Sequence, residues 1–119
     1  MIKFTILLRR TPAMTHDEFV DYHRNRHAPL FMSVPAVQEH VRRYVQTHTI
    51  AADLPGLPAT NIDGTTELWF ADQAAFAAVF TDPTYLELIR PDEARFLDLE
   101  HCEFLVTQEN VVHAGTPTA

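Results

Sequence analysis

The chain has little of several residue types on which common protein classes depend. It contains one cysteine, Cys102, so no internal disulfide can form, and this usage is compatible with a reducing compartment. Its three glycines leave no room for the Gly-rich turn that binds flavin or nicotinamide dinucleotides. We therefore expect neither a disulfide framework nor a dinucleotide cofactor.

Positive charge is also scarce. Nine Lys and Arg residues are outnumbered by sixteen Asp and Glu, which gives a formal net charge of -7 and disfavours nucleic acids and anionic membranes as partners. The apolar run at residues 4–8 is too short to span a bilayer, and Arg9 and Arg10 follow it, unlike the basic residues of a signal peptide. We predict a cytoplasmic protein with no nucleic-acid or membrane partner.

The remaining composition is that of an ordinary globular protein. Hydrophobic residues make up 46% of the 119 positions, and a chain of this length can bury a core without disulfides or a structural metal. We predict a single domain over residues 1–113 and a short C-terminal tail over residues 114–119.

The first half of the chain shows a strand, a helix and a second strand. Residues 2–9 alternate between apolar and more polar side chains, a period of two that indicates a strand. Thr15 and Glu18 form a capping box that starts a helix, and Pro29 is expected to end it at about Ala28. Residues 38–50 are rich in β-branched and aromatic side chains and are predicted to form the second strand.

The second half repeats this order after a long connection. Residues 51–64 are rich in Pro and Gly and indicate a loop longer than a hairpin turn, of the kind that is often functional. Residues 65–71 are predicted to be the third strand, and Asp72 caps a helix that runs through Phe80. Two X-Pro pairs, at 82–83 and 90–91, are expected to divide the next segment into two short helices before a last strand at 101–112.

The order β-α-β-β-α-β predicts an α+β fold in which two helices cover one face of a four-stranded antiparallel sheet. The other face would be uncovered, and either set of alternating strand residues carries large apolar groups, such as Leu7, Trp69 and Leu105 on one set. An exposed apolar face of this extent favours a homodimer through the sheets. The alternative is a monomer with a flat, polar outer face.

The segment at residues 22–30, YHRNRHAPL, comes after the capped helix start and resembles the EthD family. Residues 80–83, 92–98 and the last strand are similar to the second half of that family. The resemblance implies a ferredoxin-like βαββαβ fold that forms a dimeric α/β barrel, with a pocket in each subunit between its sheet and helices. Relatives include muconolactone-type isomerases, polyketide dehydratases and decarboxylases, cofactor-free monooxygenases and accessory proteins of ether degradation, so membership does not fix the reaction.

Two histidines in this segment are the main catalytic candidates. His23 and His27 are four residues apart, so they share one helical face with Phe19 and Leu30. An apolar wall would lower the pKa of such an imidazole and keep it a neutral base. The resemblance implies this role for His27; alternatively, both histidines suit the negative end of the helix dipole without any catalytic function.

Other side chains are candidates for holding a substrate. Tyr44 lies at a position that faces the pocket in relatives, where its hydroxyl could stabilise a carbonyl or enolate oxygen, although a core tyrosine is the common alternative. Leu68 stands where some lactone-isomerising relatives have a cysteine, which puts that reaction in doubt. We assign substrate contacts to Phe19, Leu30, Arg42, His48, Leu68 and Phe70.

A metal site is an alternative, because two helical histidines four residues apart, such as His23 and His27, can both be ligands. His40, His48, His101 or Glu67 could supply a third ligand. The chain lacks a His-Glu-x-x-His run and paired cysteines, so we predict no metal and no other cofactor.

The sequence thus favours a cofactor-independent homodimeric enzyme that performs acid/base chemistry on an apolar cyclic or aromatic carbonyl compound, by isomerisation, dehydration or decarboxylation. His27 would be the base or acid, His23 its support, and Tyr44 the group that steadies the oxyanion. Two alternatives remain open: a cofactor-free monooxygenase of phenols, and a non-catalytic accessory protein that binds a metabolite of a catabolic pathway.

Overall fold

The computed structural model describes residues 1–52 and 54–117, so residue 53 of the predicted loop and residues 118–119 of the predicted tail lie outside the described residues. The elements succeed one another as β1 (Ile2–Leu8), α1 (His16–Tyr22), a π-helical turn (His23–His27), α2 (Ala28–Met32), α3 (Pro35–His40), β2 (Val41–His48), β3 (Gly64–Phe70), α4 (Gln73–Phe80), α5 (Pro83–Phe96), a 3-10 turn (Leu99–His101) and β4 (Glu103–Thr107).

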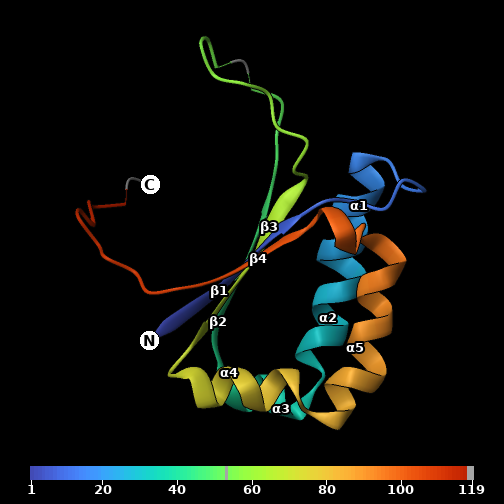
Figure 1. Cartoon of the computed structure of the whole chain (residues 1–119), viewed down its shortest axis with the longest axis vertical. Coiled ribbons are helices and arrows are strands. Elements are labelled where there is room, and N and C mark those ends of the chain that lie inside the picture. The colour runs from blue at the N-terminus through green and yellow to red at the C-terminus, as the bar shows by residue number, and fades with distance from the viewer. Residues whose placement is uncertain (53, 118–119) are drawn as a thin grey trace.

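The strands form one antiparallel sheet in the order β2-β3-β1-β4, and the helices lie on one side of it (Figure 1). This arrangement is the α+β, ferredoxin-like fold predicted from the sequence. The long β2–β3 connection extends beyond the end of the sheet at the top of Figure 1, and the segment after β4 extends to the left, away from the helices.

The strand register decides which side chains meet the helices. Phe4 of β1 pairs with Leu68 of β3, which pairs in turn with Tyr44 of β2, so these three side chains share the helix-covered face. The core on this face is made of buried apolar residues of the sheet and the helices: Ile2, Phe4, Phe31, Val34, Val37, Leu68, Phe70, Val79, Tyr85 and Ile89.

The first helix does not end at Ala28 as predicted. Thr15 and Glu18 form the expected capping box, but α1 passes into a π turn in which the amide of Ala28 bonds to the carbonyl of His23, five residues back. The wider turn places Pro29 in the first turn of α2, where a proline lacks no required hydrogen bond. The helical path therefore continues to Met32, and the π turn itself carries both candidate histidines.

Three other boundaries differ from the prediction. The start of the predicted strand at 38–50 belongs to helix α3, because Pro35 opens a helix whose Val37 is buried in the core. Pro91 does not divide α5, since burial of Tyr85, Ile89 and Phe96 along one face holds the helix together across it. Strand β4 covers only part of the predicted range 101–112. None of the helices among residues 1–52 and 54–117 is long and apolar enough to cross a membrane.

The outer face of the sheet is more mixed than the sequence analysis expected. Lys3 and Glu67 form an ion pair of 2.5 Å there, and the guanidinium of Arg43 stacks 4.7 Å from the centre of the Trp69 ring. These charged groups separate the large apolar side chains of this face, which are Leu7, Val45, Trp69 and Leu105. Charged groups therefore interrupt the extended apolar face that the sequence predicts.

Candidate active site

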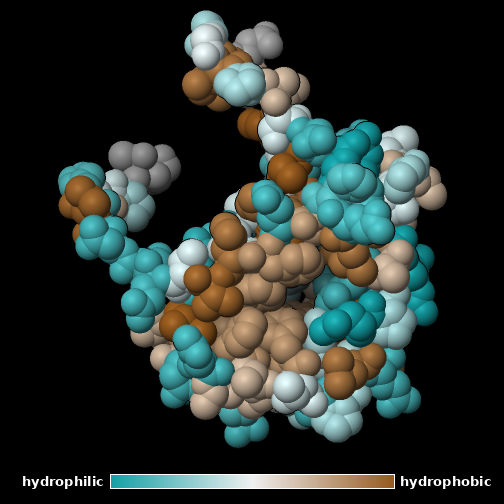
Figure 2. All heavy atoms as spheres, in the orientation of Figure 1, coloured by the Kyte–Doolittle hydropathy of each residue, from teal (hydrophilic) through white to brown (hydrophobic). Residues whose placement is uncertain are grey.

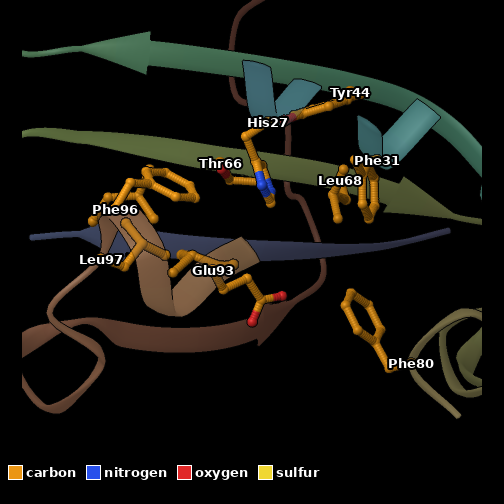
Figure 3. Close-up of a pocket in the computed structure, with 11 residues that line it drawn as sticks. His27, Phe31, Tyr44, Thr66, Leu68, Phe80, Glu93, Phe96 and Leu97 are labelled. Atoms are coloured by element: carbon orange, nitrogen blue, oxygen red, sulfur yellow. The ribbon is translucent and has the colours of Figure 1, made fainter. Parts of the chain in front are cut away.

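A narrow cavity lies between the helix-covered face of the sheet and the helices (Figure 3). Its walls are mainly apolar, with His27, Tyr44, Thr66 and Glu93 as the polar side chains among its lining residues. The apolar lining consists of Ile6, Leu8, Phe31, Leu68, Phe80, Phe96 and Leu97. An apolar cavity with a few convergent polar groups is the usual form of a small-molecule site.

The cavity continues outward into a wider hollow. This hollow shares Ile6, Phe80 and Glu93 with the inner cavity and adds Phe76 and Phe104 to its walls. Figure 2 shows apolar residues gathered around it, over the region between β4 and helices α4 and α5. The inner cavity and the outer hollow therefore adjoin at these three shared side chains.

His27 is the side chain whose surroundings most resemble those of a catalytic base. Its Nδ1 lies 2.8 Å from Oδ2 of Asp92 on α5, and the ring is 8% exposed. Asp92 also accepts hydrogen bonds from the hydroxyl of Tyr22, at 2.5 Å, and from Arg95, at 3.1 Å. Among the described residues, Nε2 of His27 has no hydrogen-bond partner, and the ring extends into the cavity (Figure 3).

Burial and hydrogen bonding set the charges of this pair. Burial lowers the pKa of His27, while its hydrogen bond with Asp92 and the charge of that carboxylate act in the opposite direction without cancelling the effect. Burial alone would raise the pKa of Asp92, but the hydrogen bonds from Tyr22, His27 and Arg95 outweigh it and lower that pKa. A neutral His27 that donates through Nδ1–H to an ionised Asp92 keeps the lone pair of Nε2 in the cavity.

Glu93 lies on the α5 side of the same cavity. Its Oε1 accepts a hydrogen bond of 2.5 Å from the hydroxyl of Tyr85, and its side chain is 17% exposed. Burial raises the pKa of Glu93, and the charge of the neighbouring Asp92 adds to this, whereas the Tyr85 hydrogen bond and the charge of Arg90 oppose it. The pKa values of His27 and Glu93 are therefore shifted toward each other.

Tyr44 reaches the cavity from β2. Its hydroxyl accepts a hydrogen bond of 2.9 Å from Nε2 of Gln46, and burial raises its pKa to about 12, so the phenol stays protonated near neutral pH. Thr66, one strand away on β3, lies in the same cavity wall. The hydroxyl of Tyr44 can donate to an oxygen of a ligand, and that of Thr66 can do so when Nε2–H of His23 donates to it.

The family model of the EthD domain matches residues 11–100. The chain belongs to the EthD family. This confirms the resemblance that the segment at residues 22–30 first indicated, and it adds no specific reaction. No curated protein matches the chain.

Solved structures of similar fold support the architecture. An EthD family protein from Bacillus halodurans C-125 is 15% identical to this chain, with a TM-score of 0.70. The match covers 92% of this chain and 99% of that protein. A dimeric ferredoxin-like protein of unknown function from Thermobifida fusca YX is 21% identical, with 89% and 88% covered and a TM-score of 0.59. A dimeric protein of unknown function with a ferredoxin-like fold from Bacteroides fragilis NCTC 9343 is 11% identical, with 91% and 95% covered and a TM-score of 0.63.

Within this EthD fold, His23 lies behind the cavity wall instead of lining it. It is fully buried against the rings of Phe19 and Phe96, which also contact each other. Its Nδ1 is 2.9 Å from Nε2 of His48, and its Nε2 is 2.9 Å from Oγ1 of Thr66. Burial lowers the pKa of His23 to about 3, and the charges of His27 and His48 act in the same direction. His23 is therefore neutral, and its hydrogen bond with Thr66 holds that side chain in the cavity wall.

The other residues singled out from the sequence are divided between cavity and surroundings. His27, Tyr44 and Leu68 line the cavity, whereas Phe19 and Phe70 are fully buried in the core and Leu30 packs against the core. His48 is bound to His23, and Arg42 is exposed at the β-bulge that interrupts the pairing of β2 with β3. Because the bulge displaces Arg42 from the alternation, its shared parity with Tyr44 does not bring it to the site.

Sequence reasoning missed two acidic residues at the site, Asp92 and Glu93. They come directly after Pro91, where the sequence predicts the start of a second short helix, but Pro91 lies inside α5 and they occupy the inner face of that helix. The detectable signal is spacing: Tyr85 and Ile89 are four residues apart, and Glu93 continues this row on the same face. Within residues 1–52 and 54–117, no three His, Cys, Asp or Glu side chains gather as a metal site requires.

We predict that the buried neutral His23 makes the protein sensitive to acid. The unfolded chain binds a proton at this imidazole below its ordinary pKa of 6.5, whereas the folded chain binds it only near pH 3. Stability should therefore fall as pH drops from about 6.5 toward 3, with this residue contributing up to about 1.4 kcal/mol per pH unit. Urea denaturation across this range should give a shallower pH dependence for His23→Gln, while the exposed control His101→Gln should keep the wild-type slope. An unchanged slope in His23→Gln would contradict the assignment.

Proposed function

We propose that this EthD family protein is a cofactor-independent enzyme that transfers protons on an apolar cyclic or aromatic carbonyl compound. The observation that carries the proposal is the pair formed by His27 and Asp92, which leaves Nε2 of a neutral imidazole without a partner among the described residues and open to an apolar cavity. A base that is desolvated and fixed in one tautomer is suited to remove a proton from carbon.

The chemistry depends on the positions of the side chains. Nε2 of His27 would take a proton from the carbon next to the carbonyl group. The electron pair of the broken C–H bond would form a C=C bond, and the π pair of the carbonyl group would move onto its oxygen to give an enolate. Tyr44 or Thr66 would donate a hydrogen bond to that oxygen, and the carboxylate of Asp92 would stabilise the imidazolium. The substrate would be held mainly by Phe31, Phe80, Phe96 and Leu68.

The proposed active form is a cytoplasmic homodimer whose subunits meet through the outer faces of their sheets. Support comes from Leu7, Val45, Trp69 and Leu105 on that face and from the two dimeric proteins of similar fold. Lys3 and Glu67 already form an ion pair within each chain, so this pair would enter the interface without unpaired charge.

The role of His27 can be tested before the natural substrate is known, with 2-tetralone as the probe. In deuterium oxide, a base in the cavity should speed the exchange for deuterium of the 2-tetralone protons on the carbons next to the carbonyl group. The exchange is measured as loss of the proton NMR signals of these positions. His27→Gln should slow the catalysed exchange by about 10²-fold or more, because a positioned base contributes a factor of this size. The exposed control His101→Gln should keep the wild-type rate, and equal rates for wild type and His27→Gln would contradict the proposal.

The same base is suited to deprotonate a phenol, the first step of a cofactor-free oxygenation. Oxygen uptake during turnover of 1-naphthol, lost in His27→Gln, would favour this second reaction class. Saturable binding of 2-tetralone without exchange would favour the non-catalytic accessory protein instead.

The dimer is tested by Leu105→Asp. Leu105 lies on the outer face of β4 and is 45% exposed in the isolated chain, so a carboxylate there should prevent two sheets from packing. Analytical ultracentrifugation should show wild type at twice the 13.6 kDa chain mass and the variant at the chain mass. Leu86→Asp, at a residue of similar exposure on α5, should remain dimeric. A monomeric wild type would contradict the proposed assembly.

A further inference from the structure

Glu93 occupies a position that the mechanism above does not use. Its side chain lines both the inner cavity and the outer hollow, so it stands where the two join. It comes from α5, whereas His27 comes from the π turn, and Figure 3 shows both side chains extending into the same cavity from different elements. A ligand that fills the inner cavity would therefore contact the imidazole and the carboxyl group at different atoms.

We propose that Glu93 is a second catalytic residue, a carboxylic acid that delivers a proton to the substrate at a position other than the one that His27 deprotonates. This inference rests on the proposed function, because it needs His27 as the base. It deepens that function by adding the acid that a reaction with two proton transfers requires.

The surroundings of Glu93 favour the protonated acid. Phe80 and Ile6 form apolar walls beside it, and the ionised Asp92 is its neighbour on α5, which disfavours a second negative charge. Tyr85 donates to Oε1, and Arg90 lies 3.6 Å from Oε2, so these two groups favour the ionised form. Arg90 is largely exposed and also stacks 5.5 Å from the centre of the Tyr85 ring, which leaves its charge partly in water.

Dehydration of a β-hydroxy carbonyl compound would use both groups. Nε2 of His27 takes the proton from a C–H group next to the carbonyl, and the electron pair of that bond forms a C=C bond. The neighbouring C–O bond breaks with its pair on oxygen, and that oxygen takes the proton of Glu93 and leaves as water. His27 is then an imidazolium and Glu93 a carboxylate, and exchange with solvent through the outer hollow restores both.

A 1,3-shift of a double bond uses the same two groups, with the proton of Glu93 delivered to the far carbon of the double bond. Decarboxylation needs no base, since the electron pair of the breaking C–C bond stays on carbon and only one proton is delivered. A site with both a base and an acid thus favours dehydration or isomerisation. The substrate class is a cyclic or aromatic-fused carbonyl compound with a β-hydroxyl group or a β,γ double bond.

The test uses a series of benzisoxazoles as probes. A base removes the proton at C3, the C–H pair forms a nitrile, and the N–O bond breaks to release a phenolate, which an acid can protonate as it leaves. With acid assistance, the rate depends weakly on the acidity of the released phenol. For 5-nitrobenzisoxazole, which releases an acidic phenol, Glu93→Gln should lose about tenfold or less in kcat/KM, and for the unsubstituted probe about 10²-fold.

Three comparisons keep the outcomes separate. Glu87→Gln, at an exposed position on the same helix, should match wild type on both probes. His27→Gln should lose activity on both probes alike. An equal loss on both probes in Glu93→Gln overturns the role of Glu93 as an acid, whereas undiminished activity in His27→Gln overturns the proposed function itself.

A pH profile of the wild type tests the acid without a variant. Elimination of the unsubstituted probe should fall toward lower pH as His27 gains its proton, and toward higher pH as Glu93 loses its proton. The decrease toward higher pH should be smaller for the nitro probe, whose leaving group needs less help. Identical decreases for the two probes toward higher pH overturn the inference.

Discussion

The hydrogen bond between Nδ1 of His27 and Oδ2 of Asp92 is the interaction on which the proposed site depends. It joins the π turn after α1 to α5, 65 residues further along the chain, and it is buried. A buried carboxylate is costly unless other groups satisfy it, and here Tyr22 and Arg95 do so. The same bond fixes the imidazole tautomer, so the lone pair of Nε2 faces an apolar cavity.

The π turn explains why two histidines four residues apart have different environments. Its wider winding keeps both His23 and His27 buried while Pro29 continues the helical path instead of ending it. His23 packs against Phe19 and Phe96, is hydrogen-bonded to Thr66 and does not line the cavity. His27, one turn later, lines the cavity. Position along the helix therefore separates the structural histidine from the proposed base.

Sequence reasoning succeeded where the signal is local. The alternation in β1 and the capping box at Thr15 need only neighbouring residues, and they predicted the fold class that the structure and the family match confirm. It failed where tertiary packing overrides a local rule, as at Pro91, which α5 accommodates because its other face is buried. Asp92 and Glu93 were missed for that reason, since their inward direction depends on an unbroken helix. The partnership of Asp92 with His27 could not be predicted, because no local pattern pairs residues 65 positions apart.

The central claim is that His27 is a neutral base with its free lone pair on Nε2, and nitrogen-15 NMR of the histidine rings across pH tests it most directly. The account predicts that near pH 7 Nδ1 of His27 carries the proton, that Nε2 shows the shift of an unprotonated nitrogen, and that the pKa lies below 6.5. Asp92→Asn should lower the pKa of His27 further, because it removes the carboxylate that raises this pKa in the wild type. A proton on Nε2, or an imidazolium at pH 7, would contradict the account.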